Sequence, residues 1–223
     1  MRSVFDENGY ALVERVFNAG QCEAIADRVS TASVVRAGSR NLLHDAWCLE
    51  LARCLKGHAA IAAYLPVAAV GVQCTLFDKS SVKNWLVALH QDLSIPVRER
   101  ITDPACTGWS EKEGVLFVQP PLPVLESLVA VRVHLDECGP GAGALRVVPG
   151  SHRHGRLTES EARHQRQANG EIECIAKRGD ALLMRPLLLH ASSKATEPVR
   201  RRVLHFLFGP SELPHALRWN NAV

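Results

Sequence analysis

Residues 179–208 read GDALLMRPLLLHASSKATEPVRRRVLHFLF, and this stretch gives the clearest indication of the fold class. It contains short runs rich in leucine and valine, which are bounded by a Gly-Asp turn, a proline and a polar connector. Five further runs of this kind begin at about residue 67: VAAVGVQCTLF, WLVALHQDL, SLVAVRVHL, GALRVV and EIECIA. Many short strands joined by Gly- and Pro-bearing connectors are typical of a sandwich, barrel or jelly roll. The sequence therefore predicts a mainly β core.

The N-terminal part predicts helices that flank this core. Apolar residues recur at helical spacing over 19–31 and again over 49–65. We therefore expect a helical lead-in over residues 1–66 and a β core over 67–210. A chain of this length forms one domain in many β-rich proteins, so we predict a single domain over residues 1–223.

Composition narrows the possible partners and the compartment. The formal net charge is +3, which is too small to indicate a nucleic acid or an anionic membrane as the partner. The longest apolar stretch, 59–72, is too short for a transmembrane helix, and the first residues lack the apolar core of a signal peptide. The seven cysteines form no CxxC pair, which indicates reduced thiols. We expect a soluble cytoplasmic protein, and the sequence does not indicate its oligomeric state.

The first candidate site is His90-Gln91-Asp92. On a strand, residues i and i+2 point to the same face, so the imidazole and the carboxylate would project side by side. Leu86 and Ala88 precede them on that face, which predicts that the pair enters an interior. A buried histidine and carboxylate need a partner charge, which a divalent metal would supply. Taken alone, this pattern is a weak signal for a metal site, and a surface pair or a hydrogen-bonded pair is the more common explanation.

Two further signals lie in the stretch quoted first. His190 closes a leucine-rich run, where a satisfied core histidine is the usual explanation. By strand alternation, one face carries Arg201, Val203, His205 and Leu207. An arginine that points inward requires a carboxylate or phosphate partner. An exposed basic edge strand is the alternative interpretation.

Together these signals indicate one kind of site. Two histidines and one carboxylate are the facial ligand set of non-haem Fe(II), which leaves open coordination positions. The order H-x-D followed by H-x10-R, with the segments HQDLSIPV, GALRVVPGSHRHGRL and GDALLMRPLLLHASS, resembles the phytanoyl-CoA dioxygenase-like family of Fe(II)/2-oxoglutarate oxygenases. The segment GYALVERVFNAGQCEAIADRV is also similar to the N-terminal strand and helix of that family.

The resemblance implies a double-stranded β-helix, which is a jelly-roll, cupin-like barrel with helices on one side. It implies His90, Asp92 and His190 as the iron ligands. It also implies Arg201 as the clamp for the C5 carboxylate of 2-oxoglutarate and Ser192 as its helper. Other strand positions line the cofactor pocket in similar proteins, and here they are Gln73, Thr75 and Arg132. Lys79 and Trp85 are expected near the pocket, and Asn84 is expected in a turn.

Two other pairs of potential metal ligands compete with this site. His134 and Asp136 form a second H-x-D, and the pattern alone does not decide between the two. The resemblance assigns His134 and Asp136 to the pocket wall. His152 and His154 follow a Pro-Gly turn, so we expect them to be structural or at the pocket rim.

The resemblance implies an enzyme that uses Fe(II), 2-oxoglutarate and O2 to hydroxylate a small molecule, with release of succinate and CO2. The acidic Asp92 argues against halogenation, which needs a small residue there. The substrate is not indicated, but the long connector 94–123, with Trp109 and Phe117, is expected to form a lid or a binding wall. The alternatives are a non-catalytic ligand-binding or sensing barrel and a cupin-like Zn or Mn enzyme. A Zn or Mn enzyme that uses no 2-oxoacid does not require an arginine that points inward at position 201.

Overall fold

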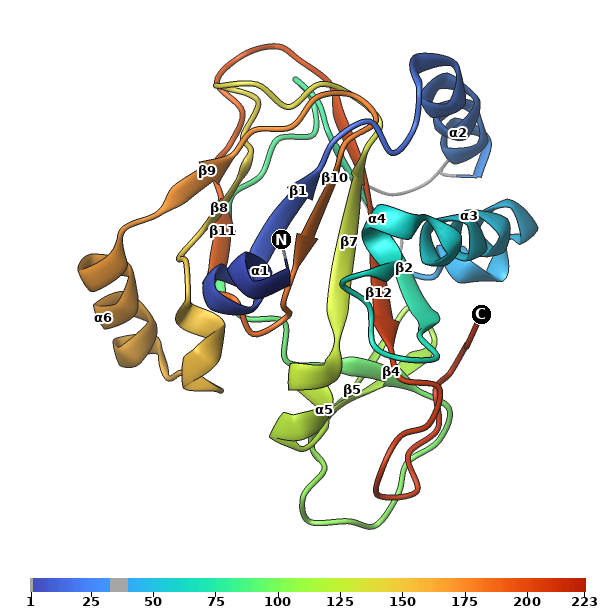
Figure 1. Ribbon diagram of the computed structural model, residues 1–223, viewed down its shortest axis with the longest axis vertical. Helices are drawn as coiled ribbons and strands as arrows, with labels where there is room; N and C mark the ends of the chain where they lie inside the picture. Colours follow the sequence, from blue (N-terminus) through green and yellow to red (C-terminus); the bar gives the residue numbers. More distant parts are fainter. Residues whose placement is uncertain (1, 33–39) are drawn as a thin grey trace.

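The computed structural model describes residues 2–32 and 40–223, and its core consists of two antiparallel sheets (Figure 1). The five-stranded sheet has the order β1-β10-β7-β12-β2, with strands Tyr10–Val13, Ala181–Met184, Val129–His134, Arg201–Gly209 and Val70–Lys79. The four-stranded sheet has the order β3-β11-β8-β9, with strands Val87–His90, His190–Ser192, Leu145–Val147 and Ile172–Cys174. The predicted mainly β, jelly-roll class is confirmed, although the sheets do not close into a continuous barrel.

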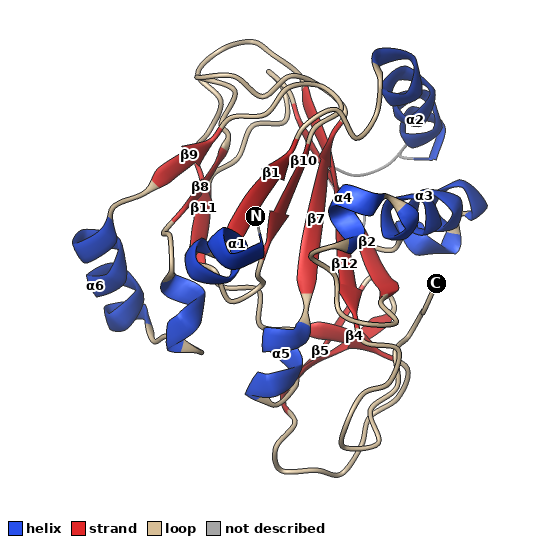
Figure 2. Ribbon diagram, viewed as in Figure 1, coloured by secondary structure: helices blue, strands red, loops and turns tan. Residues whose placement is uncertain are grey.

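Helices from the N-terminal part cover one face of the five-stranded sheet, as Figure 2 shows. They are α1 (Arg2–Asn8), α2 (Ala19–Ala32), the 3-10 turn η1 (Leu42–His44), α3 (Ala46–Gly57) and α4 (Ala59–Ala62). Their apolar side chains pack against outward-facing strand residues, which include Leu204, Phe206 and Phe208 of β12. The opposite face of the same strand lines a cavity with Arg201, His205 and Leu207, so the predicted alternation along β12 is confirmed.

The helical lead-in agrees with the expectation in one part and differs in another. The helix predicted over 19–31 is present as α2, and Asn18 accepts a hydrogen bond from the Gln21 backbone at its start. The periodicity over 49–65 predicts one helix, but the structure divides it at His58, whose backbone is extended. Gly57 is a poor helix former, which explains the break. Residues 1 and 33–39 of the lead-in lie outside the described residues, and the single-domain organisation over 1–223 stays a prediction.

The long connector 94–123 has regular structure of its own, which the sequence analysis did not predict. It contains a third sheet of order β4-β6-β5, with strands Ile95–Val97, Val115–Gln119 and Thr107–Lys112. A two-residue turn joins β5 to β6, and both turn residues, Glu113 and Gly114, have positive φ angles of 54° and 76°. Such a turn matches the twist of a hairpin, but Glu-Gly is a weaker signal than Asn-Gly. The helix α5 (Leu122–Ser127) follows.

One connector of the core also holds a helix that the sequence analysis did not predict. The helix α6 (Glu159–Asn169) begins at Thr158 with a capping box, in which the Thr158 hydroxyl and the Glu161 side chain bind each other's backbone amides. All seven cysteines are free thiols, as predicted. Within the described ranges, no helix combines the length and the apolar character that a bilayer crossing requires.

Candidate metal centre

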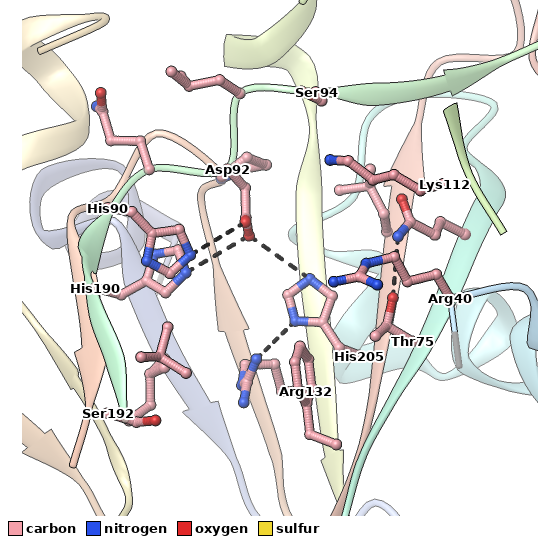
Figure 3. A pocket seen from close by; sticks show the side chains of 18 of the residues that line it. Arg40, Thr75, His90, Asp92, Ser94, Lys112, Arg132, His190, Ser192 and His205 are labelled. Carbon is pink, nitrogen blue, oxygen red and sulfur yellow. Dashed lines mark hydrogen bonds and ion pairs between the residues drawn. The ribbon is translucent and has the colours of Figure 1, made fainter. Parts of the chain in front are cut away.

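Two histidines and an aspartate converge where the four-stranded sheet faces the cavity (Figure 3). His90 ends β3 and His190 begins β11, and the two are direct cross-strand partners with ring centroids 4.2 Å apart. Asp92 follows β3, and its two carboxylate oxygens lie 3.7 Å from His90 Nε2 and 3.7 Å from His190 Nε2. Of the residues described, these are the three whose ligand atoms gather within 4.8 Å of one another. The structure therefore brings the predicted triad together.

A β-bulge sets the direction of His90. His190 pairs with His90, but Ser192 pairs with Val87, so β3 has one extra residue between these pairs. The bulge reverses the alternation, and Val87 lines the cavity while Leu86 is 61% exposed. Ala88 is exposed as well. The prediction that Leu86 and Ala88 share an interior face with the triad is therefore wrong, whereas the predicted inward direction of His90 is right.

Backbone carbonyls select the tautomer of both triad histidines. His90 Nδ1 lies 2.8 Å from the carbonyl oxygen of Ala88, and His190 Nδ1 lies 2.8 Å from that of Leu188. A carbonyl can only accept, so each Nδ1 donates and each Nε2 keeps a lone pair that faces Asp92. A second hydrogen bond of this kind is what orients histidine ligands of metals.

Electrostatics keep His190 and Asp92 in their metal-binding protonation states. Burial lowers the pKa of His190 to about 4, so this imidazole is neutral at pH 7. Burial alone would raise the pKa of Asp92, but the nearby His190, His205 and His90 outweigh burial and hold that pKa below its usual value. At pH 7 the site therefore offers the Asp92 carboxylate and the neutral imidazole of His190, which are ligands that non-haem iron accepts.

Buried cations occupy the end of the cavity beyond the triad. Arg201 is 2% exposed, and its Nε and Nη1 atoms have no hydrogen-bond partner among the described residues. Lys79 is the cross-strand partner of Arg201 on β2 and is 1% exposed. Its burial, and to a smaller extent the nearby charge of Arg201, lowers the pKa of Lys79 to about 8. Two adjacent buried cations are unfavourable without an anion. This end of the cavity therefore fits a carboxylate, which is the group that the resemblance assigned to Arg201.

Ser192 lies beside these cations. The Lys79 Nζ atom donates to Ser192 Oγ at 3.0 Å and to the carbonyl oxygen of Ser193 at 2.7 Å, and it also lies 5.3 Å from the centroid of the Trp85 ring. Sequence reasoning placed Lys79 only near the pocket. The structure makes it a second buried cation beside Arg201, and no sequence signal distinguishes it from a strand-end lysine.

The remaining predicted pocket residues come from β2 and β7. Thr75 and Gln73 line the cavity, and Gln73 Nε2 donates to Thr75 Oγ1 at 3.0 Å. Arg132 is 5% exposed, and its Nη1 lies 2.8 Å from Nδ1 of His205. Burial and the charge of Arg201 lower the pKa of Arg132 to about 10, and burial and Arg132 lower the pKa of His205 to about 3. Strand alternation put His205 on the face of Arg201, and the structure places it in the cavity with Nε2 at 4.0 Å from Asp92 Oδ2.

The two competing pairs, His134 with Asp136 and His152 with His154, form no metal site among the described residues. Asp136 accepts from the Arg202 guanidinium at 2.7 and 2.8 Å, so its carboxylate is fully engaged in a structural ion pair. His134 is buried, and burial lowers its pKa to about 3. His152 contacts the carbonyl oxygen of Asp6 at 3.1 Å, and His154 lies outside the cavity. Asn84 exchanges two hydrogen bonds with the backbone of Ala195 and is structural, as expected for a turn residue.

The cavity has a volume of about 540 Å³ and takes one wall from the third sheet. Lys112, Phe117 and Gln119 of that sheet line it, so the connector 94–123 supplies a wall as the sequence suggested. Trp109 is not among the lining residues. The charged side chains that line the cavity are Arg40, Lys79, Asp92, Lys112, Arg132 and Arg201. The described part of the cavity wall is therefore cationic, and the one acidic residue in that part, Asp92, belongs to the triad.

Several solved structures have a similar fold. HygX from Streptomyces hygroscopicus, solved with nickel and 2-oxoglutarate bound, is 18% identical with a TM-score of 0.65, and the match covers 94% of this chain and 85% of HygX. The carbocyclase SnoK from nogalamycin biosynthesis, described as non-heme and alpha ketoglutarate dependent, is 12% identical with a TM-score of 0.68, covering 95% of this chain and 83% of SnoK. EctD from S. alaskensis in its apoform is 18% identical with a TM-score of 0.70, covering 99% of this chain and 84% of EctD. At these identities the similarity establishes the fold.

A comparison with curated proteins found no match. The family model for phytanoyl-CoA dioxygenase (PhyH), in contrast, matches residues 5–203, which is nearly the whole chain and includes all three triad residues and Arg201. This protein belongs to the phytanoyl-CoA dioxygenase (PhyH) family.

Proposed function

We propose that this protein is an Fe(II)- and 2-oxoglutarate-dependent dioxygenase that hydroxylates a small molecule and releases succinate and CO2. One relationship carries the proposal: the triad of His90, Asp92 and His190 shares a cavity with the buried guanidinium of Arg201, whose Nε and Nη1 atoms have no hydrogen-bond partner among the described residues. A set of metal ligands and a buried cation in one cavity match a 2-oxoacid that binds iron at one end and a cation at the other.

The triad residues are the proposed iron ligands. Both histidines present Nε2 lone pairs because their Nδ1 atoms donate to backbone carbonyls, and Asp92 supplies a negative charge that partly balances the metal. When bound here, Fe(II) would supply the activation of O2, which no side chain of the protein can perform. His90 and Asp92 keep side-chain exposures of 40% and 39%, so the triad is open toward the cavity and can accept further ligands.

Arg201, Lys79 and Ser192 are the proposed binding group for the distal carboxylate of 2-oxoglutarate. The guanidinium and the ammonium compensate the carboxylate charge, and the Ser192 hydroxyl already accepts a hydrogen bond from Lys79 and can donate to an anion. Arg132, Thr75 and Gln73 line the same cavity and are proposed to contact the co-substrate or to shape its site. The burial of these groups excludes water, which strengthens each charge interaction.

Hydroxylation is the proposed outcome because Asp92 fills the position that a halide would need. The fold does not determine the outcome, since SnoK is described as a carbocyclase and the similar SnoN as an epimerase. The substrate is proposed to be a small molecule held against the wall formed by Phe117, Lys112 and Gln119. The seven free thiols fit a reducing compartment, so we propose that the enzyme acts in the cytoplasm.

Succinate release tests the proposal directly. The purified protein is incubated with Fe(II), 2-oxoglutarate and O2, first alone and then with a panel of small molecules, and succinate is measured. We expect slow uncoupled release without substrate and faster release with a matching compound. No succinate under any condition, together with tight 2-oxoglutarate binding, would indicate the non-catalytic ligand-binding alternative. Release that requires Zn or Mn and no 2-oxoacid would indicate a cupin-like metalloenzyme.

A further inference from the structure

His205 lies between Asp92 and Arg132 and has no role in the site described so far (Figure 3). Its Nδ1 atom is 2.8 Å from Arg132 Nη1, and its Nε2 atom is 4.0 Å from Asp92 Oδ2. His205 and Arg132 are cross-strand partners on β12 and β7, and both residues are buried. The position of the imidazole is therefore set by two central strands of the sheet.

Arg132 determines which nitrogen of His205 carries the proton. A guanidinium has only N–H donors, so Nδ1 of His205 must accept the hydrogen bond at 2.8 Å. A neutral imidazole that accepts at Nδ1 carries its hydrogen on Nε2. The Nε2–H group of His205 therefore faces the Asp92 carboxylate, and this nitrogen has no lone pair to offer a metal.

This arrangement is the reverse of that in the triad. His90 and His190 donate from Nδ1 to backbone carbonyls and keep lone pairs on Nε2, whereas His205 accepts at Nδ1 and donates from Nε2. Three imidazoles thus surround one carboxylate, but the chain gives two of them the ligand tautomer and one the donor tautomer. The difference arises from the partner at Nδ1, which is a carbonyl in two cases and a guanidinium in the third.

We propose that His205 is a positioning residue that holds the Asp92 carboxylate by donation from Nε2, and that Arg132 keeps His205 from becoming a further metal ligand. The proposal rests on the metal site put forward above. The distance of 4.0 Å exceeds a hydrogen bond, and a shift of the carboxylate by about 1 Å closes it. With one oxygen held by His205, Asp92 presents the other oxygen to the metal as a single ligand atom.

The test uses Co(II) alone as the probe, added to the metal-free protein without 2-oxoglutarate, with the visible absorption spectrum as the readout. His205→Phe removes the donor and keeps a ring, and we expect Co(II) affinity to fall about tenfold, as is usual when a partner of a metal ligand is lost. His205→Gln keeps a donor and should recover most of the affinity. Arg132→Met removes the donor at Nδ1 of His205. The imidazole can then carry its hydrogen on Nδ1 and offer the lone pair of Nε2 to the metal, so we expect a changed Co(II) spectrum. The double variant Arg132→Met/His205→Phe should lose that change.

Phe77→Leu is the matched control. The Phe77 ring packs against both His205 and Arg132. Its centroid lies 5.9 Å from the centroid of the His205 ring and 5.2 Å from the guanidinium carbon of Arg132. The Phe77 side chain has no hydrogen-bonding group. We expect this variant to keep the wild-type Co(II) affinity and spectrum. The proposal is overturned if His205→Phe binds Co(II) like Phe77→Leu, if His205→Gln is as weak as His205→Phe, or if Arg132→Met has the wild-type spectrum. A wild-type protein that binds no Co(II) would instead overturn the proposed function itself.

Discussion

His90 and His190 face each other across two antiparallel strands, with their rings 4.2 Å apart and both Nε2 atoms 3.7 Å from the carboxylate of Asp92. The pairing of β3 with β11 places these residues, and a bulge in β3 turns His90 toward the cavity. Side chains held in this way by strand pairing are already oriented before a metal binds, which favours a preorganised site.

The first prediction concerns the carboxylate of the triad. Asp92→Asn keeps the shape but removes the charge, so we expect Fe(II) affinity to fall by at least tenfold and uncoupled succinate release to be nearly abolished. Asp136→Asn is the control, because it alters the second H-x-D and breaks the ion pair with Arg202. It should lower the free energy of unfolding while leaving metal affinity unchanged. Loss of metal binding in Asp136→Asn but not in Asp92→Asn would mean that the site is misassigned.

The second prediction concerns Arg201. Arg201→Ala should raise the dissociation constant of 2-oxoglutarate sharply and leave Fe(II) affinity intact, because Arg201 begins β12 and is not among the charged groups that act on Asp92. Arg201→Met should also raise the melting temperature of the metal-free protein by an effect of about 1 kcal/mol or more, since it removes a buried charge whose Nε and Nη1 atoms lack hydrogen-bond partners among the described residues. Calorimetric titration and thermal unfolding measure the two effects. Equal loss of iron and 2-oxoglutarate binding would show that Arg201 is structural.

The third prediction is a pH dependence of 2-oxoglutarate binding. Burial and Arg201 lower the pKa of Lys79 to about 8, and only the protonated amine attracts a carboxylate. The dissociation constant should therefore be constant below about pH 8 and rise above it, by at most about tenfold per pH unit. Lys79→Met should bind more weakly at pH 7 and show no such rise. If the dissociation constant of Lys79→Met rose with pH as in the wild type, the pH dependence would come from a group other than Lys79.

The fourth prediction is a loss of stability in acid for the metal-free protein. The pKa values of His134, His190 and His205 are lowered by burial to about 3, 4 and 3. In the unfolded chain these residues protonate near their ordinary pKa, so the unfolded state binds more protons as the pH falls below about 6.5. The free energy of unfolding should decrease from there toward pH 4, by about 1 kcal/mol per pH unit for each histidine.

His134→Leu isolates one of these contributions, since both ring nitrogens of His134 lack a hydrogen-bond partner among the described residues. Urea unfolding at a series of pH values should give a smaller slope for this variant than for the wild type. An identical slope would mean that His134 is not buried in its neutral form.

The sequence predicted the residues of the site better than their surroundings. The sequence pointed to H-x-D, the distal histidine and the arginine eleven residues later because each is a polar group in an apolar run, and the family resemblance joined them. The correct direction of His90 rested on a wrong premise, since Leu86 and Ala88 lie on the exposed side of the bulge. A bulge adds one residue to a strand and leaves no reliable mark in the pattern of apolar residues.

Elements outside the core were harder to predict for local reasons. The helix α6 is polar and shows little apolar periodicity, but its Thr158-x-x-Glu161 capping box was readable in the sequence. The third sheet depends on a Glu113-Gly114 turn that lacks the usual Asn-Gly signal. The role of Lys79 depends on its cross-strand pairing with Arg201, and such long-range contacts are not contained in either segment alone.

The central claim is that one cavity holds iron at the triad and 2-oxoglutarate between the triad and Arg201. Anaerobic addition of Fe(II) followed by 2-oxoglutarate tests it most directly, because a 2-oxoacid that chelates Fe(II) gives a visible metal-to-ligand charge-transfer band. We predict the band in the wild type, its appearance at much higher 2-oxoglutarate concentration in Arg201→Ala, and its absence in Asp92→Asn. A wild-type protein that binds both components without developing the band would contradict the account.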